Sequence, residues 1–503
     1  MTHISQRAQL TTSKFSKTRK ALLLTGLLTG VISCSTVDRV EPQELELSPA
    51  YSNTQQDVSA LWWQSFSDDQ LNQLVEQALK QNYQVQAAFA RVKQSQALYS
   101  QQSSGYYPSL DASLSKTRTW SDQTDAATGV SQETTSDKWQ ASLSTSYELD
   151  FWGRVSALSD QAEFQSLAQV SGYQALQNTV ASQVVLSWYG IQKQLVTLQL
   201  LQQQYQLAEK NLTAIRLRQQ RSLVTVTDVW QQQQQVEALA SEIYSAELEL
   251  KNLEQQLALW LGQGVLTPAQ LDKLAVLADS HFQLPVQQQV LSLSSQVLKN
   301  RPDVQQAFFQ LQAANAGLAT AAANRYPRFT ITASISDSQN NFDDLFDNWL
   351  ANLAGNLVLP IIDGDNRRAQ VRNQEAKVEE SLANYQQTLL TAAQETEQAL
   401  RSEKSAFASS MSVAKQLELA EKTLKYKKSR YLRGATTYLD FASAQNSVFQ
   451  LQRQHIQAQY SQLQARVQLH KAVNDGAFDQ ALASDLASEL APELRSSNEN
   501  SPE

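Results

Sequence analysis

Few residues in this sequence have the types and spacing that catalysis or metal binding requires. The four histidines are scattered, and no two of them have the i, i+4 spacing of a metal site on a helix. The sequence contains no GxSxG motif and no glycine-rich phosphate loop. Cys34 is the only cysteine, which excludes an internal disulfide and zinc sites built on cysteine pairs. We therefore expect no catalytic residue, no metal and no cofactor, and a protein that is not an enzyme.

The chemistry expected at Cys34 is covalent lipidation. Residues 1–33 carry five basic and no acidic residues and end in the apolar run ALLLTGLLTGVIS, which is typical of a signal peptide. The segment VISC resembles a bacterial lipobox, although Val31 and Ile32 depart from the usual leucine and small residue. Ser35 follows, and by analogy with bacterial lipoproteins it suits sorting to the outer membrane. We predict a lipid-anchored outer-membrane protein; a leftover cysteine is the alternative.

Composition narrows the class of protein further. Only 14 glycines and 10 prolines occur in 503 residues, which indicates long elements and few loops. No stretch after the leader reaches about 18 apolar residues, so we expect no transmembrane helix. The formal net charge is −8, and removing the basic leader makes it more negative. Nucleic acid is therefore not an expected partner.

The elements that would position any site occur twice. An ungapped offset of 219 pairs Leu79 with Leu298 and the Tyr-Pro step at Pro108 with that at Pro327. In each half a helical pattern ends near this proline, because proline lacks an amide and clashes with the preceding turn. Alternating polar and apolar residues follow, which indicate a β-hairpin. The shared helix break in one register indicates an internal duplication.

Each half has the same predicted order: helix, β-hairpin, long helix, return helix. The pattern predicts hairpins at 109–150 and 328–360, long helices at 155–221 and 367–430, return helices at 228–262 and 438–474, and leading helices at 68–105 and 288–325. The first long helix spans about 100 Å at 1.5 Å per residue, about the combined length of the two shorter helices beside it. The four strands of roughly 10–12 residues match the length that a tilted strand needs to cross a bilayer.

Four strands cannot close a barrel, and open sheet edges are not viable in lipid. We therefore expect a mixed α and β fold in which subunits complete a transmembrane β-barrel, continued by a long α-helical coiled-coil barrel in the periplasm. Trp120 and Trp139 flank strand ends and are candidates for an interfacial aromatic girdle, with packing between strands as the alternative.

The sequence resembles the TolC-like outer-membrane factors over roughly residues 60–475. The resemblance rests on the duplicated element order, the YYP and RYP junctions, FWGRV with its counterpart PIIDGDNRRAQV, and the turn motif YLRGATTYLDFASAQ. The lipobox and LWWQSF are similar to the lipoprotein, efflux-type branch. The resemblance implies a homotrimer that works with a periplasmic adaptor and an inner-membrane pump of the resistance-nodulation-division class. It also implies helix-to-barrel junctions at Pro108, Gly153, Pro327 and Gly364.

The resemblance also implies a periplasmic gate. Its candidate residues are Asp228, Tyr431, Gly434 and Asp440. Two gate residues of some members are missing, since Thr436 stands in place of Arg and Ser443 in place of Asp; Arg433 or Arg221 is a candidate replacement for the ionic role. Both aspartates also have the spacing of a capping box after Thr225 and Thr437, so helix capping alone explains them equally, and both roles can coexist.

The function expected is a passive exit duct for small molecules. A channel for type I protein secretion is an alternative, and so is a structural periplasmic lipoprotein without a pore. The predicted organisation is a signal peptide (1–33), a lipidated N-terminal extended segment (34–60), a first repeat (61–264), a linker near the middle of the tube (265–287), a second repeat (288–475) and an acidic C-terminal tail (476–503).

Overall fold

The computed structural model describes residues 61–124, 131–271 and 295–473. Cys34 lies outside these residues, as do the predicted signal peptide and the C-terminal tail, so lipidation stays a prediction. The first repeat contains η1 (Trp62–Phe66), α2 (Asp69–Gln81), α3 (Tyr83–Ser103), η2 (Ser104–Tyr106), β1 (Ser109–Thr124), β2 (Ser131–Leu149), α4 (Arg154–Gln220) and α5 (Val226–Trp260). The second contains α7 (Ser295–Asn300), α8 (Pro302–Ala323), β3 (Arg328–Gln339), η3 (Phe342–Asp344), β4 (Leu350–Val358), α9 (Asn366–Leu432) and α10 (Tyr438–Val473).

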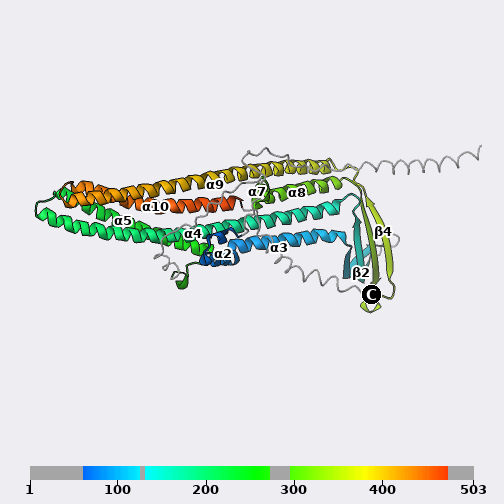
Figure 1. The fold of residues 1–503 in the computed structure, drawn as a ribbon. Helices are drawn as coiled ribbons and strands as arrows, with labels where there is room; N and C mark the ends of the chain where they lie inside the picture. The colour runs from blue at the N-terminus through cyan, green and yellow to red at the C-terminus, as the bar shows by residue number, and fades with distance from the viewer. Residues whose placement is uncertain (1–60, 125–130, 272–294, 474–503) are drawn as a thin grey trace, which may run out of the picture.

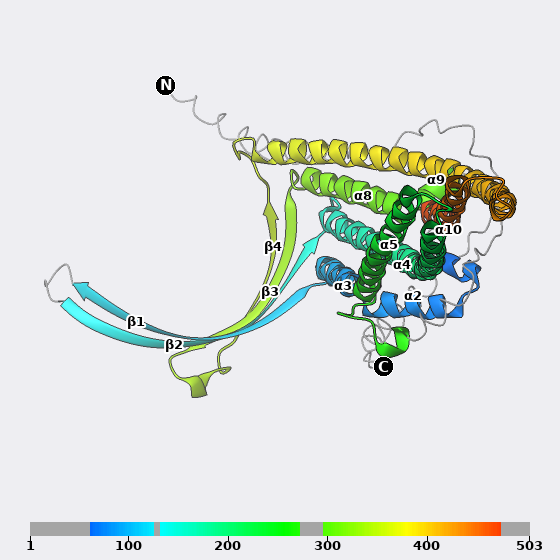
Figure 2. The same cartoon turned by 90° about the vertical axis from the view of Figure 1, so that its left-hand side faces the viewer.

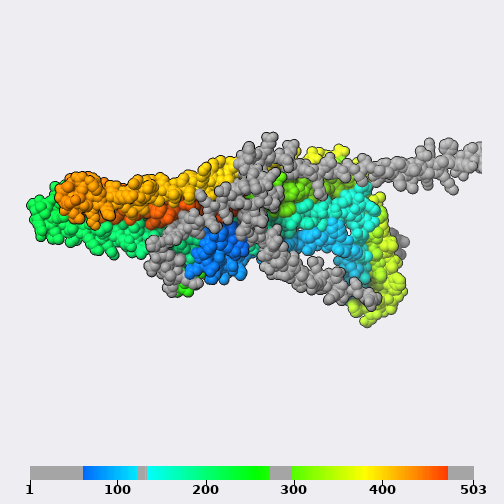
Figure 3. Space-filling model, in the orientation of Figure 1, coloured from blue at the N-terminus to red at the C-terminus, as the bar shows by residue number. Residues whose placement is uncertain are grey.

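The helices form a long rod with the sheet at one end (Figure 1). α4 and α9 each have 67 residues, about 100 Å at 1.5 Å per residue. α3 and α5 follow one another along α4, and α8 and α10 do the same along α9. The space-filling view shows α2 as a bulge midway along the rod (Figure 3). None of the helices in the described ranges combines the length and apolar character needed to cross a membrane.

Heptad-spaced residues of α4 bury the contact between the two repeats. Leu201, Ala208 and Ile215 are all buried, and they pack in one cluster with Leu239 of α5 and Phe441 of α10. A stripe that recurs every seven residues faces the same neighbour along its whole length, as in a coiled coil. At the end of the rod far from the sheet, helices of both repeats therefore form one packed unit.

The leading helix of each repeat is broken in two, which the continuous helical pattern did not predict. Asn82 separates α2 from α3 and caps α3, because its side chain accepts from the amides of Gln84 and Val85 at 2.9 and 3.3 Å. Arg301 separates α7 from α8 and is followed by Pro302, which suits the first position of a helix. The two breaks lie at the offset of 219 that relates the repeats.

The four strands form one antiparallel sheet in the order β1-β2-β3-β4. β1 and β2 contain 16 and 19 residues, which is longer than the expected 10–12, whereas β3 and β4 contain 12 and 9. Pairing in the first hairpin continues to Thr124 and Ser131, and the Arg118 guanidinium bonds the Asp137 carboxylate directly opposite it. Such cross-strand pairs stabilise a hairpin beyond the membrane-length core.

An aromatic core around the N-terminal η1 lies midway along the rod. Trp62 stacks on His470 of α10 with ring centroids 5.5 Å apart and donates from Nε1 to Asn178 at 3.1 Å. Trp188 of α4 donates from Nε1 to Asp68 at 2.8 Å. Burial, followed by the nearby Arg466, lowers the pKa of His470 to about 4. The chain entering at Trp62 is thus fixed to the end of α10.

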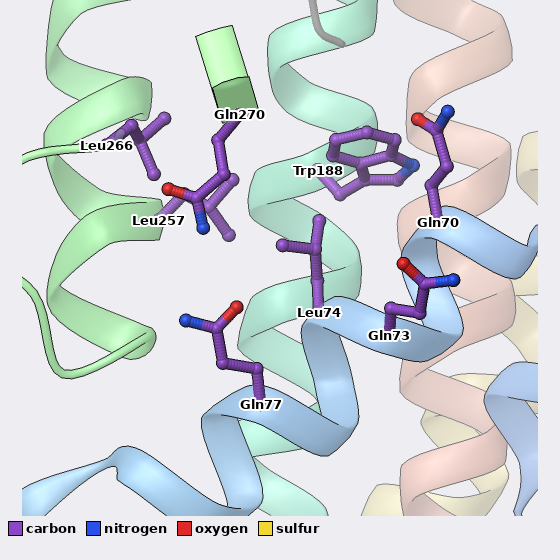
Figure 4. Close-up of a pocket in the computed structure, with 8 residues that line it drawn as sticks. All are labelled: Gln70, Gln73, Leu74, Gln77, Trp188, Leu257, Leu266 and Gln270. Carbon is purple, nitrogen blue, oxygen red and sulfur yellow. The ribbon is translucent and has the colours of Figure 1, made fainter. Parts of the chain in front are cut away.

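A small cavity beside this core is shown in Figure 4. Its volume is about 80 Å³, and its lining consists of Gln70, Gln73, Leu74, Gln77, Trp188, Leu257, Leu266 and Gln270. Pockets that hold drug-sized ligands have volumes of about 300–1,000 Å³. The cavity is therefore too small to serve as a substrate pocket.

Candidate functional site

The residues singled out from the sequence gather at the two ends of the rod. At the tip far from the sheet, the α4–α5 and α9–α10 turns lie next to each other (Figure 1). A hollow of about 910 Å³ between them is lined by residues of both turns, including Asp228, Tyr431 and Gly434. The structure thus brings three of the four gate candidates to one hollow, with Asp440 a short distance along α10.

The two tip turns share one local structure. Ser222 and Gly434 follow the ends of α4 and α9 and have φ of 58° and 71°. In each turn the next amide, of Leu223 or Ala435, donates back to an arginine carbonyl in the last helical turn, at 3.0 and 2.9 Å. Gly434 is suited to this left-handed backbone, whereas Ser222 adopts it with a side chain. The difference at this position between the two sequence motifs therefore does not change the turn.

Asp228 satisfies the capping prediction. The Thr225 hydroxyl accepts from the Asp228 amide at 3.3 Å, and the Asp228 carboxylate accepts from the Thr225 amide at 2.9 Å. This is the reciprocal arrangement of a capping box, and it holds the start of α5. The Thr225 hydroxyl also donates to the carboxylate at 2.7 Å. These hydrogen bonds of Asp228 all lie within its own turn.

Asp440 makes the same cap and also bonds the neighbouring helix. Its carboxylate accepts from the hydroxyls of Thr437 and Thr436 at 2.7 and 2.8 Å. The Lys427 ammonium, on α9, donates to the other carboxylate oxygen at 3.3 Å. The hydrogen bonds from Thr437, Thr436 and Lys427 hold the pKa of Asp440 well below its usual range. Asp440 therefore stays charged and ties α10 to α9.

The cation that bonds Asp440 is Lys427, and not Arg433 or Arg221, the two candidates from the sequence. Arg433 instead donates to the carbonyl and hydroxyl of Ser429 at 3.2 and 3.0 Å. Thr436, in the place of an arginine, supplies a neutral hydroxyl to the same carboxylate. Lys427 and Asp440 stand at nearly equal distances in sequence from the Gly434 turn. Counting outward from the turn could have identified the pair.

Tyr431 contributes its ring to this site. It stacks on Phe441 with centroids 5.4 Å apart and an interplanar angle of 4°. The Arg218 guanidinium, from the last turn of α4, lies 4.7 Å from the centroid of the Tyr431 ring. This cation–π contact joins the two hairpins at the tip. The sequence did not indicate Arg218 as a partner of Tyr431, and a gate role of Tyr431 stays a prediction.

Tyr438 adds a second link between the hairpins. It is buried, and its hydroxyl donates to Gln232 of α5, whose side-chain amide donates to the Ala208 carbonyl at 2.8 Å. Burial raises the pKa of Tyr438, so its hydroxyl keeps the proton that this bond needs. A buried polar chain of this kind is costly to break, because each group would be left without a partner. It spans α10, α5 and α4.

The junction residues lie at the opposite end of the rod, where helices meet the sheet. Pro108 and Pro327 directly precede β1 and β3. Trp152 joins the two repeats here: it donates from Nε1 to the Pro327 carbonyl at 2.8 Å and stacks on Tyr326 with centroids 4.9 Å apart. Gly153 precedes α4 with φ of 68°. The link fixes the start of β3 against the end of the first hairpin.

The second junction uses a different residue at the helix start. Gly364 has φ of 63°, and Asp365, which directly precedes α9, has φ of 70°. Asp365 therefore occupies the place that Gly153 holds before α4. The Asp363 carboxylate accepts from the Arg367 amide at 3.2 Å and satisfies an amide of the first turn. Both long helices thus begin after a left-handed residue.

The described residues contain no group of His, Cys, Asp and Glu side chains placed to hold a metal ion. The candidate residues instead join helices to helices and helices to the sheet. What the arrangement can do is hold a tip closed, or let it open, around a hollow that both hairpins line.

Comparison with known proteins agrees with this architecture. The family model described as outer membrane efflux protein matches residues 74–263 and 293–475. The pyoverdine export outer membrane protein OpmQ of Pseudomonas putida is 28% identical over 465 residues, which cover 90% of this chain and 97% of that protein. The probable outer membrane lipoprotein SilC of Salmonella typhimurium is 26% identical over 443 residues, covering 86% of this chain and 92% of SilC.

A solved structure shows the same fold. The CmeC outer membrane channel of Campylobacter jejuni superimposes with a TM-score of 0.78 at 21% identity, covering 88% of this chain and 95% of that one.

Proposed function

The chain belongs to the outer membrane efflux protein family, and on that premise we propose that three copies form the exit duct of a tripartite efflux system. The proposal rests on the open sheet of one chain. Within the described residues β1 and β4 are the two edges, and neither edge is paired. Unpaired edges are not viable in lipid, whereas three copies of four strands give a closed barrel of about 12 strands.

The helical rod supports the same assembly. Large apolar side chains remain exposed along α5 and α9 of the single chain, and they include Tyr244, Leu248, Leu259, Leu390, Leu419 and Tyr426. Neighbouring subunits around a tube would cover such side chains, as in a helical bundle. The assembled duct therefore consists of a β-barrel in the outer membrane and a helical tube in the periplasm.

Solutes pass through the duct passively. The energy for export comes from an inner-membrane pump of the resistance-nodulation-division class, which a periplasmic adaptor links to the duct. One relative is named for the export of pyoverdine, a small molecule, and this favours small-molecule efflux over protein secretion. Another relative is named an outer membrane lipoprotein, which supports lipidation of Cys34 in this chain. A wide duct needs no substrate pocket, and the cavity of Figure 4 is too small to be one.

The tip is the gate of the duct. The Asp440–Lys427 pair, the Tyr431 ring contacts and the Tyr438–Gln232 bond hold the α9–α10 hairpin to its own helices and to the first hairpin. Opening moves this hairpin outward and breaks some of these contacts. Because each exposed ionic contact contributes only about 0.2–1 kcal/mol, a docked adaptor can shift the balance.

The test is the assembly and conductance of the lipidated protein purified in mild detergent. Native mass spectrometry should give the mass of a trimer, and planar bilayers should show single channels. A stable monomer without conductance would overturn the proposal. A trimer that conducts only after it is joined to an adaptor would support it and place the closed state at the tip.

A further inference from the structure

Two helices, α5 and the tip half of α9, form the two outer sides of the subunit near the tip. α5 packs on α4 and touches α10, whereas α9 packs on α10 and α8. In the view from the tip, α5 and α9 lie on opposite sides of α4 and α10 (Figure 2). Each of these two helices therefore turns one face away from the rest of its own subunit.

The outward face of α5 is a stripe of exposed residues with helical spacing. Tyr244 and Leu248 on this stripe are 71% and 65% exposed. The stripe lies opposite the buried side of the helix, which includes Val236 and Leu239. Steps of three, four or seven residues keep side chains on one side of a helix. The α5 stripe consists of Trp230, Glu237, Tyr244, Leu248, Lys251, Gln255 and Leu259.

The outward face of α9 is a second stripe with the same spacing. Met411 and Leu419, both on this stripe, are 62% and 52% exposed. Exposed apolar side chains at regular helical spacing are typical of a face that packs on another helix. Lysines alternate with the apolar residues along it. The α9 stripe consists of Lys404, Ala408, Met411, Lys415, Leu419, Lys422 and Tyr426.

The two stripes match in height above the tip. In a ring of subunits around one axis, the tip turns of neighbouring subunits lie at the same level. Leu223 and Ala435 mark the middle of the two turns, and both helices rise by 1.5 Å per residue from there. Counted in residues from these positions, the register brings level Glu237 (14) with Lys422 (13), Tyr244 (21) with Lys415 (20), Leu248 (25) with Met411 (24), and Gln255 (32) with Lys404 (31).

α5 carries a negative charge after its neighbours are counted. The helix contains six acidic residues and one basic residue, Lys251. Three cations of the adjacent helices face it. Arg453 lies 3.4 Å from the Glu242 carboxylate, Arg216 donates to Gln233 at 3.5 Å, and Lys193 interacts electrostatically with Glu249. Two acidic charges remain in excess.

The tip half of α9 carries the opposite charge. From Lys404 to Leu432 it contains seven basic and two acidic residues. One of the two acidic residues, Glu418, bonds Lys415 and Lys422 at 2.8 and 2.6 Å. The Asp440 carboxylate of α10 adds one more negative charge to this face. Four basic charges remain in excess.

The charges decide which faces can meet. Two α5 faces would bring acidic side chains together, and two α9 faces would bring basic side chains together, and such like-charge contacts suppress a pairing. An α5 face against an α9 face joins opposite charges. This head-to-tail contact repeats from one subunit to the next and closes a ring.

We propose that the α5 stripe of one subunit packs antiparallel against the α9 stripe of a second copy, with Glu237 opposite Lys422 and Leu248 opposite Met411. The pairing rests on the proposed function, because it requires subunits side by side around one axis. It adds the identity of the two faces and their register. The exposed apolar residues of both stripes are then covered, and the contact is strengthened by charge.

The register is tested by disulfide formation in the full, lipidated protein, whose only native cysteine is Cys34. Leu248→Cys combined with Met411→Cys should give covalent trimers on a non-reducing gel after mild oxidation. Leu248→Cys combined with Leu419→Cys is the matched control. Leu419 lies eight residues, about 12 Å, nearer the tip than Met411, and a disulfide needs Cα atoms within about 7 Å. This control should stay monomeric on the gel.

The charge contact is tested by reversal. Lys422→Glu should raise the dissociated fraction of the trimer in native mass spectrometry by about twofold to fivefold, and adding Glu237→Lys should restore part of the loss. Lys422→Glu also loses the bond to Glu418, so the comparison is between this variant and the double variant. Glu237→Lys combined with Lys428→Glu should show no restoration, because Lys428 lies about 120° around the helix from Lys422.

The outcomes separate the pairing from the duct. A conducting trimer in which the Leu248–Met411 pair fails to cross-link, or links no better than the Leu248–Leu419 pair, would overturn the pairing and leave the duct intact. Rapid labelling of single cysteines at positions 248 and 411 by a maleimide in that trimer would likewise overturn it, since the stripes would be free for a partner of another kind. An unmutated protein that stays monomeric would reject both proposals.

Discussion

Asn82 and Arg301 stand at the same position of the two repeats, and each bonds a carbonyl at the end of its own return helix. Asn82 donates from its side-chain amide to Trp260, the last residue of α5, at 2.9 Å. Arg301 donates from its guanidinium to Ala472, next to the last residue of α10, at 3.4 Å. Two different side chains thus make the same kind of contact. In each repeat, the residue at the break of the leading helix donates to an unpaired carbonyl at the end of the return helix.

Removing this connection should destabilise the middle of the rod. We expect Asn82→Ala to lower the free energy of unfolding by about 1–2 kcal/mol, because it removes the cap of α3 and the donor to the Trp260 carbonyl. Asn82→Ser is the matched variant, since it keeps a capping oxygen and loses the amide donor to Trp260 without adding a charge, and it should cost less. Thermal unfolding of the assembled protein measures both, and equal stability of all three proteins would contradict the role.

Arg301→Gln should cost about 1–3 kcal/mol, because two carbonyls, of Ala392 and Ala472, lose a buried donor. The carboxylates of Asp303 and Glu395, which also bond Arg301, are 41% and 55% exposed and remain hydrated. The loss should therefore stay below that of a fully buried ion pair. Circular-dichroism melts of Arg301→Gln and Arg301→Lys separate the contribution of the hydrogen bonds from that of the positive charge. Only Arg301→Lys, which keeps the charge, should retain part of the stability.

The gate and cap roles of the tip aspartates can be separated by one matched pair. Asp228→Ala and Asp440→Ala each remove a capping box and should each cost about 1 kcal/mol of local stability. Only Asp440 also bonds Lys427 on the neighbouring long helix. We expect Asp440→Ala to raise single-channel conductance in planar bilayers, and Asp228→Ala to leave it unchanged. Lys427→Gln should reproduce the opening without the loss of the cap.

If Asp440→Ala and Asp228→Ala give the same conductance, the pair caps helices and does not gate. Tyr431 provides a further check, because its ring contacts Phe441 and Arg218. Tyr431→Phe keeps the ring and should change conductance little, whereas Tyr431→Ala should add to the opening caused by Asp440→Ala.

The buried His470 should make stability depend on pH. Its folded pKa of about 4 lies below the ordinary 6.5, so between these values the unfolded chain binds a proton that the folded chain does not. The free energy of unfolding should fall as pH drops from 6.5 toward 4, by up to about 1.4 kcal/mol per pH unit and subunit. Thermal melts at pH 7 and pH 5 should show the loss.

His470→Phe should flatten this pH dependence, because phenylalanine keeps the stacking surface for Trp62 and cannot titrate. A slope that persists in His470→Phe would assign the effect to another group.

Ser222 and Gly434 hold equivalent left-handed positions in the two tip turns, so exchanging serine and glycine should have opposite effects on the stability of the two turns. Ser222→Gly should stabilise the first turn by about 0.5–1 kcal/mol, since glycine adopts a positive φ without strain. Gly434→Ser should destabilise the second turn by a similar amount; among the described residues no atom would meet a Cβ there within 4 Å, so the cost is conformational. Hydrogen exchange at the amides of Leu223 and Ala435 measures each turn, and no change in either would contradict the account.

Lipidation of Cys34 is tested by mass. Intact-mass analysis of the mature protein should find a chain that begins at Cys34 with attached acyl groups. Cys34→Ser should lower the amount of protein in the outer membrane more than it lowers the conductance of assembled channels, because the barrel and tube can still fold. An unmodified chain that begins elsewhere would reject the anchor.

The sequence predicted the elements well where one physical signal controls them. Pro108 and Pro327 marked the change from helix to strand because proline removes an amide, and the two long helices fall within a few residues of their predicted bounds. The break at Arg301 was missed although Pro302, which suits the first position of a helix, signals it. The break at Asn82 was missed because a polar residue within a helical pattern does not reveal an end unless its tertiary partner is known. The lengths of β1 and β2 were missed because pairing such as Arg118 with Asp137 continues beyond the membrane-length pattern.

The sequence indicated which residues lie at the tip better than it indicated which residues they contact. Asp228 and Asp440 were predicted as gate residues with helix capping as the alternative, and the structure shows a capping box at each of them. The partner Lys427 and the ring contact of Arg218 with Tyr431 depend on how helices from distant segments lie against one another. Such contacts are set by packing, which the spacing of residues within one helix does not encode.

The breaks at Asn82 and Arg301 give the rod a joint. α4 and α9 run unbroken from tip to sheet, whereas the helices beside them are divided near the middle of the rod, where side-chain hydrogen bonds of Asn82 and Arg301 stand in place of a continuous backbone. We expect any bending of the rod to concentrate at this level. The outward movement of the tip that we propose should then be taken up halfway along the molecule, away from the sheet.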